Sequence, residues 1–152
     1  MTATFEEAKK SAAGLLDFLD YCSEEYEKGQ RRLKVAGELI RESSEQPGLV
    51  GRYDQLRAEL RALKAIHERK LRKVKGELWR HYLENYNRTL GSKDIEQYIL
   101  SDQRYQNAEN VVCEIEVVYD KMHGLVENMR SKGWSISNNV KLRTSGLEDA
   151  LV

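Results

Sequence analysis

The sequence has little of what disulfide frameworks, loop-rich folds and membrane spans require. It contains two cysteines and one proline in 152 residues, and no apolar run approaches the roughly 20 residues that span a bilayer. Cys22 and Cys113 form no CxxC motif and lie at or beside apolar helix positions, so we expect reduced, inert core thiols. Glu6 and Glu7 come early and no apolar region follows, which argues against a signal peptide. We therefore expect a cytoplasmic protein with no membrane association.

Catalytic signatures are missing as well. The sequence has no Walker loop, no Gly-x-Ser-x-Gly motif and no glycine-rich turn between a strand and a helix. Metal sites in helix bundles need several converging carboxylate–histidine pairs, which the three histidines, His67, His81 and His123, do not provide. We predict a chain that is not an enzyme and has no cofactor and no metal site. His67 lies on an apolar stripe and is interpreted as a hydrogen-bonded core histidine.

The most prominent pattern in the sequence is a spacing of apolar residues that alternates between three and four positions, which is typical of helices that pack against other helices. The first such stripe starts at Phe5, after a capping-box pattern formed by Thr4 and Glu7, and continues to Ile40. Its other members are Ala8, Ala12, Leu15, Leu19, Cys22, Tyr26, Gly29, Leu33 and Ala36. Pro47–Gly48 predicts the turn that ends this region. Residues 1–46 are therefore expected to form an N-terminal helix.

Two further long helices follow, at 47–91 and 92–133. Ser92 is the expected N-cap of the second of these, and Gly133 is its expected C-terminal stop. Residues 134–152 read either as a hairpin around Asn138–Asn139 or as a short helix with a frayed tail, and we favour the helix because an isolated hairpin is marginal.

The predicted fold class is all-α. Three long helices and a short C-terminal helix make one domain overall. Long helices with narrow apolar stripes bury little surface on their own, so we expect them to assemble into a helical homo-oligomer.

Positive charge is concentrated in the middle of a chain whose formal net charge is zero. Residues 52–80 carry ten basic and four acidic side chains. A row of cations beside an aromatic side chain is the minimum for sequence-neutral binding of a single strand, although a row of this kind also occurs as a simple solvated helix face. The candidate DNA-binding residues are Arg61, Lys64, Arg69, Arg72, Lys73, Lys75, Trp79 and Arg80.

The stripe of the 92–133 helix is the most regular and supplies the candidate oligomer contacts. Packing inside one chain and packing between chains both fit such a stripe. The candidate oligomerisation residues are Val112, Ile115, Tyr119, Met122, Val126, Met129 and Trp134.

A little over half of the chain, from about Leu56 to Arg143, resembles the UvsY family of phage recombination mediators. A charged helix runs into an aromatic cluster, a loop follows near Gly91, and an ungapped helical stretch leads to a block around Gly133. The blocks that carry the resemblance are Leu78-Trp79-Arg80-His81-Tyr82, Tyr98-Ile99-Leu100-Ser101-Asp102 and Met129-Arg130-Ser131-Lys132-Gly133-Trp134-Ser135-Ile136.

The resemblance implies a function in DNA recombination and repair, in the cytoplasm of an infected bacterial host. It implies a ring-like homo-oligomer, a hexamer or heptamer, that binds single-stranded DNA without sequence preference. Its implied partners are a RecA-like recombinase and a single-strand DNA-binding protein, which it helps to exchange. The family's DNA contacts lie just before the aromatic cluster, where the nearest matches are Arg72, Lys73 and Lys75.

Two departures from the family pattern stand beside the resemblance. Gly76, Glu77 and Leu78 occupy the positions immediately before Trp79, and no aromatic residue follows Arg143. The alternative prediction is a structural coiled-coil scaffold with no nucleic-acid role. A second alternative is an adaptor that offers an apolar groove to a protein partner.

Overall fold

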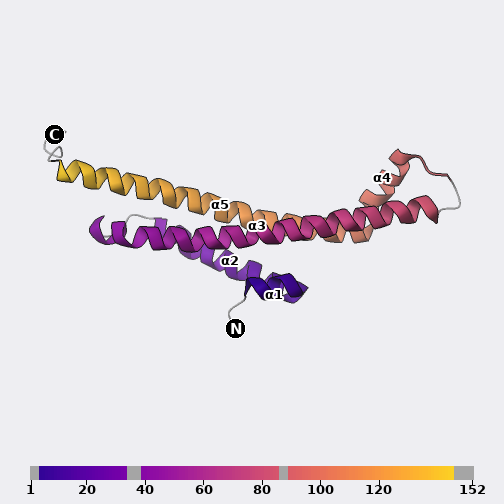
Figure 1. Ribbon diagram of the computed structural model, residues 1–152, viewed down its shortest axis with the longest axis horizontal. Coiled ribbons are helices and arrows are strands. Elements are labelled where there is room, and N and C mark those ends of the chain that lie inside the picture. The colour runs from indigo at the N-terminus through magenta and orange to yellow at the C-terminus, as the bar shows by residue number, and fades with distance from the viewer. Residues whose placement is uncertain (1–3, 34–38, 86–88, 146–152) are drawn as a thin grey trace. The chain divides into compact units, whose positions relative to one another are not determined.

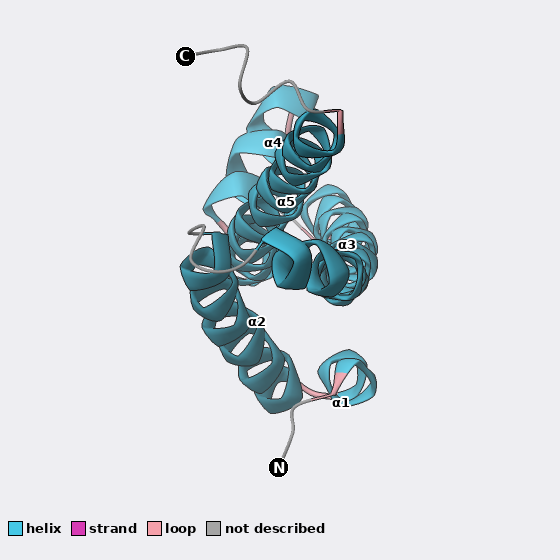
Figure 2. Ribbon diagram, turned by 90° about the vertical axis from the view of Figure 1, so that its left-hand side faces the viewer, coloured by secondary structure: helices cyan, strands magenta, loops and turns pink. Residues whose placement is uncertain are grey.

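In the computed structural model, which describes residues 4–33, 39–85 and 89–145, every regular element is a helix (Figure 2). This confirms the predicted all-α class. No helix in these ranges is both long enough and apolar enough to cross a membrane. The elements, in chain order, are α1 (Phe5–Lys10), α2 (Ala12–Leu33), α3 (Leu39–Glu84), α4 (Ser92–Ser101) and α5 (Gln103–Thr144) (Figure 1).

The chain divides into two compact units. The terminal unit consists of Met1–Glu59 and Val118–Val152, and the middle unit consists of Leu60–Val117. The long helices α3 and α5 each supply residues to both units, whereas α1 and α2 belong to the terminal unit and α4 belongs to the middle unit.

The chain begins as the sequence predicts but is interrupted at Ser11. The Thr4 side chain accepts a hydrogen bond from the Glu7 backbone N–H (3.3 Å), and the Glu7 carboxylate accepts one from the Thr4 N–H (3.1 Å), which confirms the capping box. A single helix over 1–46 is wrong, because Ser11 is in an extended conformation and its Oγ accepts from the Gly14 N–H (3.0 Å). This side-chain bond satisfies an amide at the start of α2 that has no partner within the helix.

The turn predicted at Pro47–Gly48 is also wrong, because α3 continues through both residues. Proline within a helix removes one backbone hydrogen bond and costs roughly 3 kcal/mol, so packing must offset the local preference. The Gln46 side-chain amide donates to the Met129 carbonyl of α5 (2.6 Å), and Pro47 and Val50 line a hollow together with α5 residues.

The expected helix over 92–133 begins at the predicted residue, but it is wrong in its middle and at its C-terminal end, and its predicted N-cap is off by one residue. Ser92 is the first residue of α4 and the N-cap is Gly91, whose N–H donates to Asp94 (3.3 Å). The chain breaks at Asp102, and α5 continues through Gly133 to Thr144, so the separate C-terminal helix is absorbed into α5.

Packing explains why Gly133 does not end the helix. Ile136, one turn beyond, is buried, and a side-chain carbon at Gly133 would lie 3.4 Å from Gln46 of α3. That distance is an ordinary van der Waals contact, so Gly133 lies where α5 packs beside α3, and the burial of Ile136 favours continuation of the helix.

The terminal unit has a core built from α2, α3 and α5. Gly29 on α2 lies where an added side-chain carbon would be 2.5 Å from Leu125 of α5 and 3.1 Å from Tyr53 of α3, so the three helices approach closely there. The predicted stripe is confirmed for Leu15, Leu19 and Cys22 but is wrong at Ala12, which is exposed. Ala36 and Ile40 of that stripe lie outside the residues whose side chains are described. Other buried residues of this core are Phe18, Tyr53, Leu56, Met122, Leu125, Val126, Met129 and Ile136.

The middle unit has a smaller core between α3, α4 and α5. Leu78, Ile95, Ile99 and Tyr105 are buried together at its centre. Half-buried residues packed against these four are Leu71, Val74, Trp79, Tyr82 and Leu90.

Candidate nucleic-acid interface

The α3 segment of the middle unit has one buried side and one cationic side. Leu60, Leu63 and Leu78 are buried, and residues on the opposite side of the helix are exposed. Steps of three and four place the exposed cations on one side, interleaved with the small exposed residues Ala65 and Gly76. We call this side the arginine face, which consists of Arg61, Arg69, Arg72, Lys73 and Arg80.

Two of the predicted DNA-binding cations are instead used inside the middle unit. Lys64 Nζ lies 2.6 Å from Glu116 Oε1 of α5, and Lys75 Nζ lies 3.6 Å from Glu96 Oε1 of α4. Both lysines are half-buried and their charges are compensated by the neighbouring helix. These ion pairs link helices of the middle unit and offset the two charges, so both lysines contribute less to an external field than the arginine face does.

The cations of the arginine face have few partners. Within the part of the chain that the structure describes, the four arginines of the face make no ion pair, and Lys73 makes only a long contact with Glu77 (3.9 Å) between two exposed side chains. An exposed pair of this kind contributes little. Lys70 was not among the residues predicted to bind DNA, but it is also exposed and makes no ion pair with another described residue. The ten-to-four excess of basic residues in 52–80 was the available signal for Lys70.

The Trp79 side chain is not fully exposed beside the cations of the arginine face. It is half-buried and packs against the central cluster of the middle unit. The nearby aromatic pair Tyr82 and Tyr98 is stacked, with ring centroids 5.5 Å apart and an angle of 24° between the planes. The stacked rings of Tyr82, near the end of α3, and Tyr98, in α4, therefore help to hold α4 against α3.

Asp102 fixes the junction between α4 and α5. Its carboxylate accepts from the Arg104 side chain (3.0 Å and 3.1 Å), from the Arg104 backbone N–H (2.9 Å) and from the Tyr82 hydroxyl (2.9 Å). These donors, the Arg104 side chain first, lower the pKa of Asp102 to about 2. The carboxylate is therefore ionised at neutral pH, caps the first turn of α5 and links it to α3.

The candidate oligomerisation residues divide into two groups. Tyr119 is half-buried and stacks on His123 (centroids 6.0 Å apart), while Trp134 is 75% exposed. The others are buried within the single chain and belong to its own cores, so another chain reaches them only if these cores open. Those buried residues are Val112, Ile115, Met122, Val126 and Met129.

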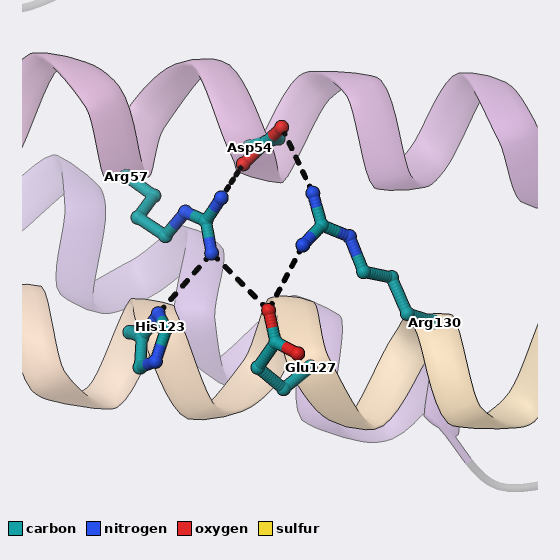
Figure 3. Close-up of polar contacts among 5 residues, drawn as sticks. All are labelled: Asp54, Arg57, His123, Glu127 and Arg130. Atoms are coloured by element: carbon teal, nitrogen blue, oxygen red, sulfur yellow. Dashed lines mark hydrogen bonds and ion pairs between the residues drawn. The ribbon is translucent and has the colours of Figure 1, made fainter.

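Arg57 and Arg130 of the terminal unit have acidic partners between α3 and α5 (Figure 3). Arg57 contacts Asp54 (2.5 Å), Glu127 (3.3 Å) and His123 Nδ1 (3.1 Å). Arg130 reaches across from α5 to Asp54 (3.3 Å) and also contacts Glu127 (2.9 Å). These guanidinium groups are therefore committed to joining two helices of their own unit.

A second compensated group lies between α2 and α3. Glu25 is only 3% exposed, and its carboxylate accepts from Arg52 (2.6 Å) and Lys28 (2.9 Å). The predicted stripe did not include Glu25, although Glu25 lies three residues after Cys22 and four before Gly29 on the buried side.

The two cysteines differ in their surroundings. Burial, reinforced by Glu59 and Glu25, raises the pKa of the Cys22 thiol to about 12, as expected for an inert thiol. Cys113 is exposed, so its predicted core position is wrong.

No group of three or more His, Cys, Asp or Glu side chains that could hold a metal ion occurs in the described ranges. His67 is half-buried and, among these residues, makes no hydrogen bond; burial, and then Lys70, lower its pKa.

The chain matches no protein-family model, no curated protein and no solved structure. The resemblance to UvsY-type mediators accordingly rests on the sequence blocks alone and stays a prediction.

Proposed function

We propose that this chain binds single-stranded DNA without sequence preference through the arginine face of α3. With the sequence resemblance taken into account, we further propose that it acts as a recombination mediator. In that role a homo-oligomer organises the strand and promotes loading of a RecA-like recombinase where single-strand DNA-binding protein was bound.

The observation that carries the proposal is the contrast between compensated and uncompensated cations. Lys64 and Lys75 are paired with acidic residues of α5 and α4, whereas the arginines of the arginine face have no ion-pair partner among the described residues. A helical face that keeps several unpaired arginines and interleaves them with alanine and glycine gives a polyanion close access. Guanidinium groups bind phosphate with two parallel hydrogen bonds, which suits a backbone and is indifferent to base sequence.

The mechanism is electrostatic. The cations of the arginine face neutralise phosphates and release the counterions condensed on the strand, so the affinity falls as salt rises, with a slope of about −0.7 per phosphate contacted on a single strand. The half-buried Trp79 packs against the core of its unit, so the proposal gives base stacking a smaller part than phosphate contact. No step requires nucleotide hydrolysis by this chain.

The test is fluorescence anisotropy of a labelled homopolymeric DNA strand, titrated with protein at several salt concentrations. We expect binding that prefers single strands to duplex and weakens steeply with salt. The decisive comparison is Arg72→Ala/Arg80→Ala against Lys64→Ala/Lys75→Ala, since both variants lose two positive charges. The arginine variant should lose about 1.4 from the magnitude of the salt slope, and the lysine variant clearly less.

Equal losses in the two variants would contradict the assignment of the face while leaving DNA binding itself intact. No binding by the unaltered chain at low salt would contradict the proposed function.

A structural scaffold is the second candidate, and the helix lengths favour it. α3 and α5 run for 46 and 42 residues, which gives long surfaces for helix–helix contact. A scaffold without a nucleic-acid role would bind the labelled strand no better than a neutral protein of its size.

A further inference from the structure

The exposed side of α2 carries a row of acidic residues. Asp17, Asp20, Glu24 and Glu27 are exposed and follow one another at intervals of three, four and three. The other side of α2, which includes Phe18 and Cys22, is buried in the terminal unit. We call the four acidic residues the acidic face. None of the four makes an ion pair with another described residue.

The acidic face is similar in length and opposite in charge to the Arg69–Arg80 part of the arginine face. Asp17 to Glu27 covers ten residue steps, about 15 Å of helix, and Arg69 to Arg80 covers eleven, about 16.5 Å. Each face therefore carries uncompensated charge of one sign, and the other face carries charge of the opposite sign over a similar length of helix.

Two exposed leucines fix the register in which these faces fit. Leu16 and Leu83 are 55% and 62% exposed, and each lies beside one of the two charged rows. Leu16 precedes Glu27 by eleven residues, and Leu83 follows Arg72 by eleven. An antiparallel arrangement that brings the leucines together therefore also places Glu27 opposite Arg72.

The same register places other charges favourably. Asp20 lies four residues after Leu16 and Arg80 lies three before Leu83, so they are neighbours across the contact. Arg31, the exposed cation beyond the acidic face, lies fifteen residues after Leu16 and meets Glu68, fifteen before Leu83. Charge complementarity thus extends past the four acidic residues on α2.

We infer that the acidic face of one copy docks antiparallel on the arginine face of a second copy, with Leu16 against Leu83. The two surfaces differ, so the contact is head-to-tail, and each copy can give one face and receive the other. Repetition of the contact builds a ring or an open chain. The inference needs no nucleic acid and goes beyond the proposed DNA binding.

The contact also has a consequence for the arginine face. Phosphates and the acidic face would use the same guanidinium groups, so a strand and a neighbouring copy compete for that surface, and the homo-oligomer of the proposed function organises a strand at arginine faces from which the neighbouring copy is displaced. Without DNA, the face is covered by another copy, and both interactions weaken as salt rises.

Sedimentation without DNA tests the contact, with variants that reverse two charges each. The acidic-face variant is Asp20→Lys/Glu27→Lys, the arginine-face variant is Arg72→Glu/Arg80→Glu, and the combined variant carries all four changes. At about 50 mM salt we expect the unaltered chain to associate and each double variant to sediment as a monomer. The combined variant, and an equimolar mixture of the two double variants, should associate again, because opposite charges face each other once more.

The matched control is Glu114→Lys/Asp120→Lys, which reverses two exposed acidic residues of α5 and should associate like the unaltered chain. Helical circular dichroism identifies any variant that has lost its fold, and the mixture rescues the test because each partner keeps one natural face. The inference is overturned if the unaltered chain is monomeric at low salt, if its association is insensitive to salt, or if neither the mixture nor the combined variant associates. None of these outcomes depends on whether the chain binds DNA.

Discussion

The two units differ in how the described cations of α3 are used. In the terminal unit, Arg52, Arg57 and Arg130 each contact acidic groups of a neighbouring helix, and one of these, Glu25, is nearly inaccessible. In the middle unit, Lys64 and Lys75 play that part, while the arginines of the same helix point away from the core and have no ion-pair partners among the described residues. The comparison shows that cation density alone does not mark a binding surface; what matters is whether the fold has already supplied the counter-charge.

The largest expected effect is loss of the terminal core. Phe18→Ala should lower the free energy of unfolding by about 3–5 kcal/mol, because the Phe18 ring is 1% exposed and its removal leaves a cavity. Chemical denaturation monitored by circular dichroism measures the change. A loss below about 1 kcal/mol would mean that α2 does not pack on this unit as described.

The next effect compares a compensated arginine with an uncompensated one. Arg52→Met should destabilise the chain by about 1–3 kcal/mol, because the buried Glu25 carboxylate loses its closest donor and retains only Lys28. Arg72→Met should change stability by no more than about 0.5 kcal/mol, because Arg72 is exposed and makes no ion pair with the described residues. The same denaturation curves measure both, and equal losses would erase the distinction between the two units.

Acid should weaken the middle unit through Asp102. Its pKa is lowered to about 2 from an ordinary value of 3.8, so the carboxylate stabilises the folded state above about pH 4. That contribution is lost as the pH falls from about 4 to about 2. Asp102→Asn should be less stable at pH 7 and should lose less stability over this interval, as measured by denaturation at each pH. An unchanged pH profile would show that the donors around Asp102 do not favour its ionised form.

The smallest expected effect is a gain in stability. Gly76 lies within α3 on the arginine face, and a side-chain carbon there would meet nothing within 4 Å. Gly76→Ala should therefore raise the free energy of unfolding by about 0.5–1 kcal/mol, because alanine loses less backbone entropy in a helix. Thermal unfolding measures the shift, and a lower midpoint would show that this face is not open.

Helix class and much of the core were predictable from local spacing. The capping box at Thr4 and the buried positions Leu15 and Leu19 follow from capping chemistry and side-chain periodicity. The helical nature of residues 134–142 follows from the marginal stability of the alternative, an isolated hairpin. The same reasoning was wrong at Pro47–Gly48 and at Gly133. Local preferences of about 1–3 kcal/mol at these residues are smaller than what α3 and α5 gain by packing over residues far apart in the sequence.

The candidate site was only partly predictable for a related reason. The cation excess on α3 is visible in the sequence, but the partners that remove Lys64 and Lys75 from it come from α5 and α4, 52 and 21 residues further along. Trp79 likewise looked available and is half-buried against residues of α4.

By itself, the sequence determined that the described chain is helical, where most apolar stripes lie, and that positive charge gathers on the middle of α3. These follow from interactions between residues three and four apart. Only the tertiary structure decided where the long helices continue, which residues of the apolar stripes are buried within one chain, and which cations keep their charge uncompensated. Those outcomes depend on pairs of residues that are brought together by packing, and no local pattern specifies the distance between them.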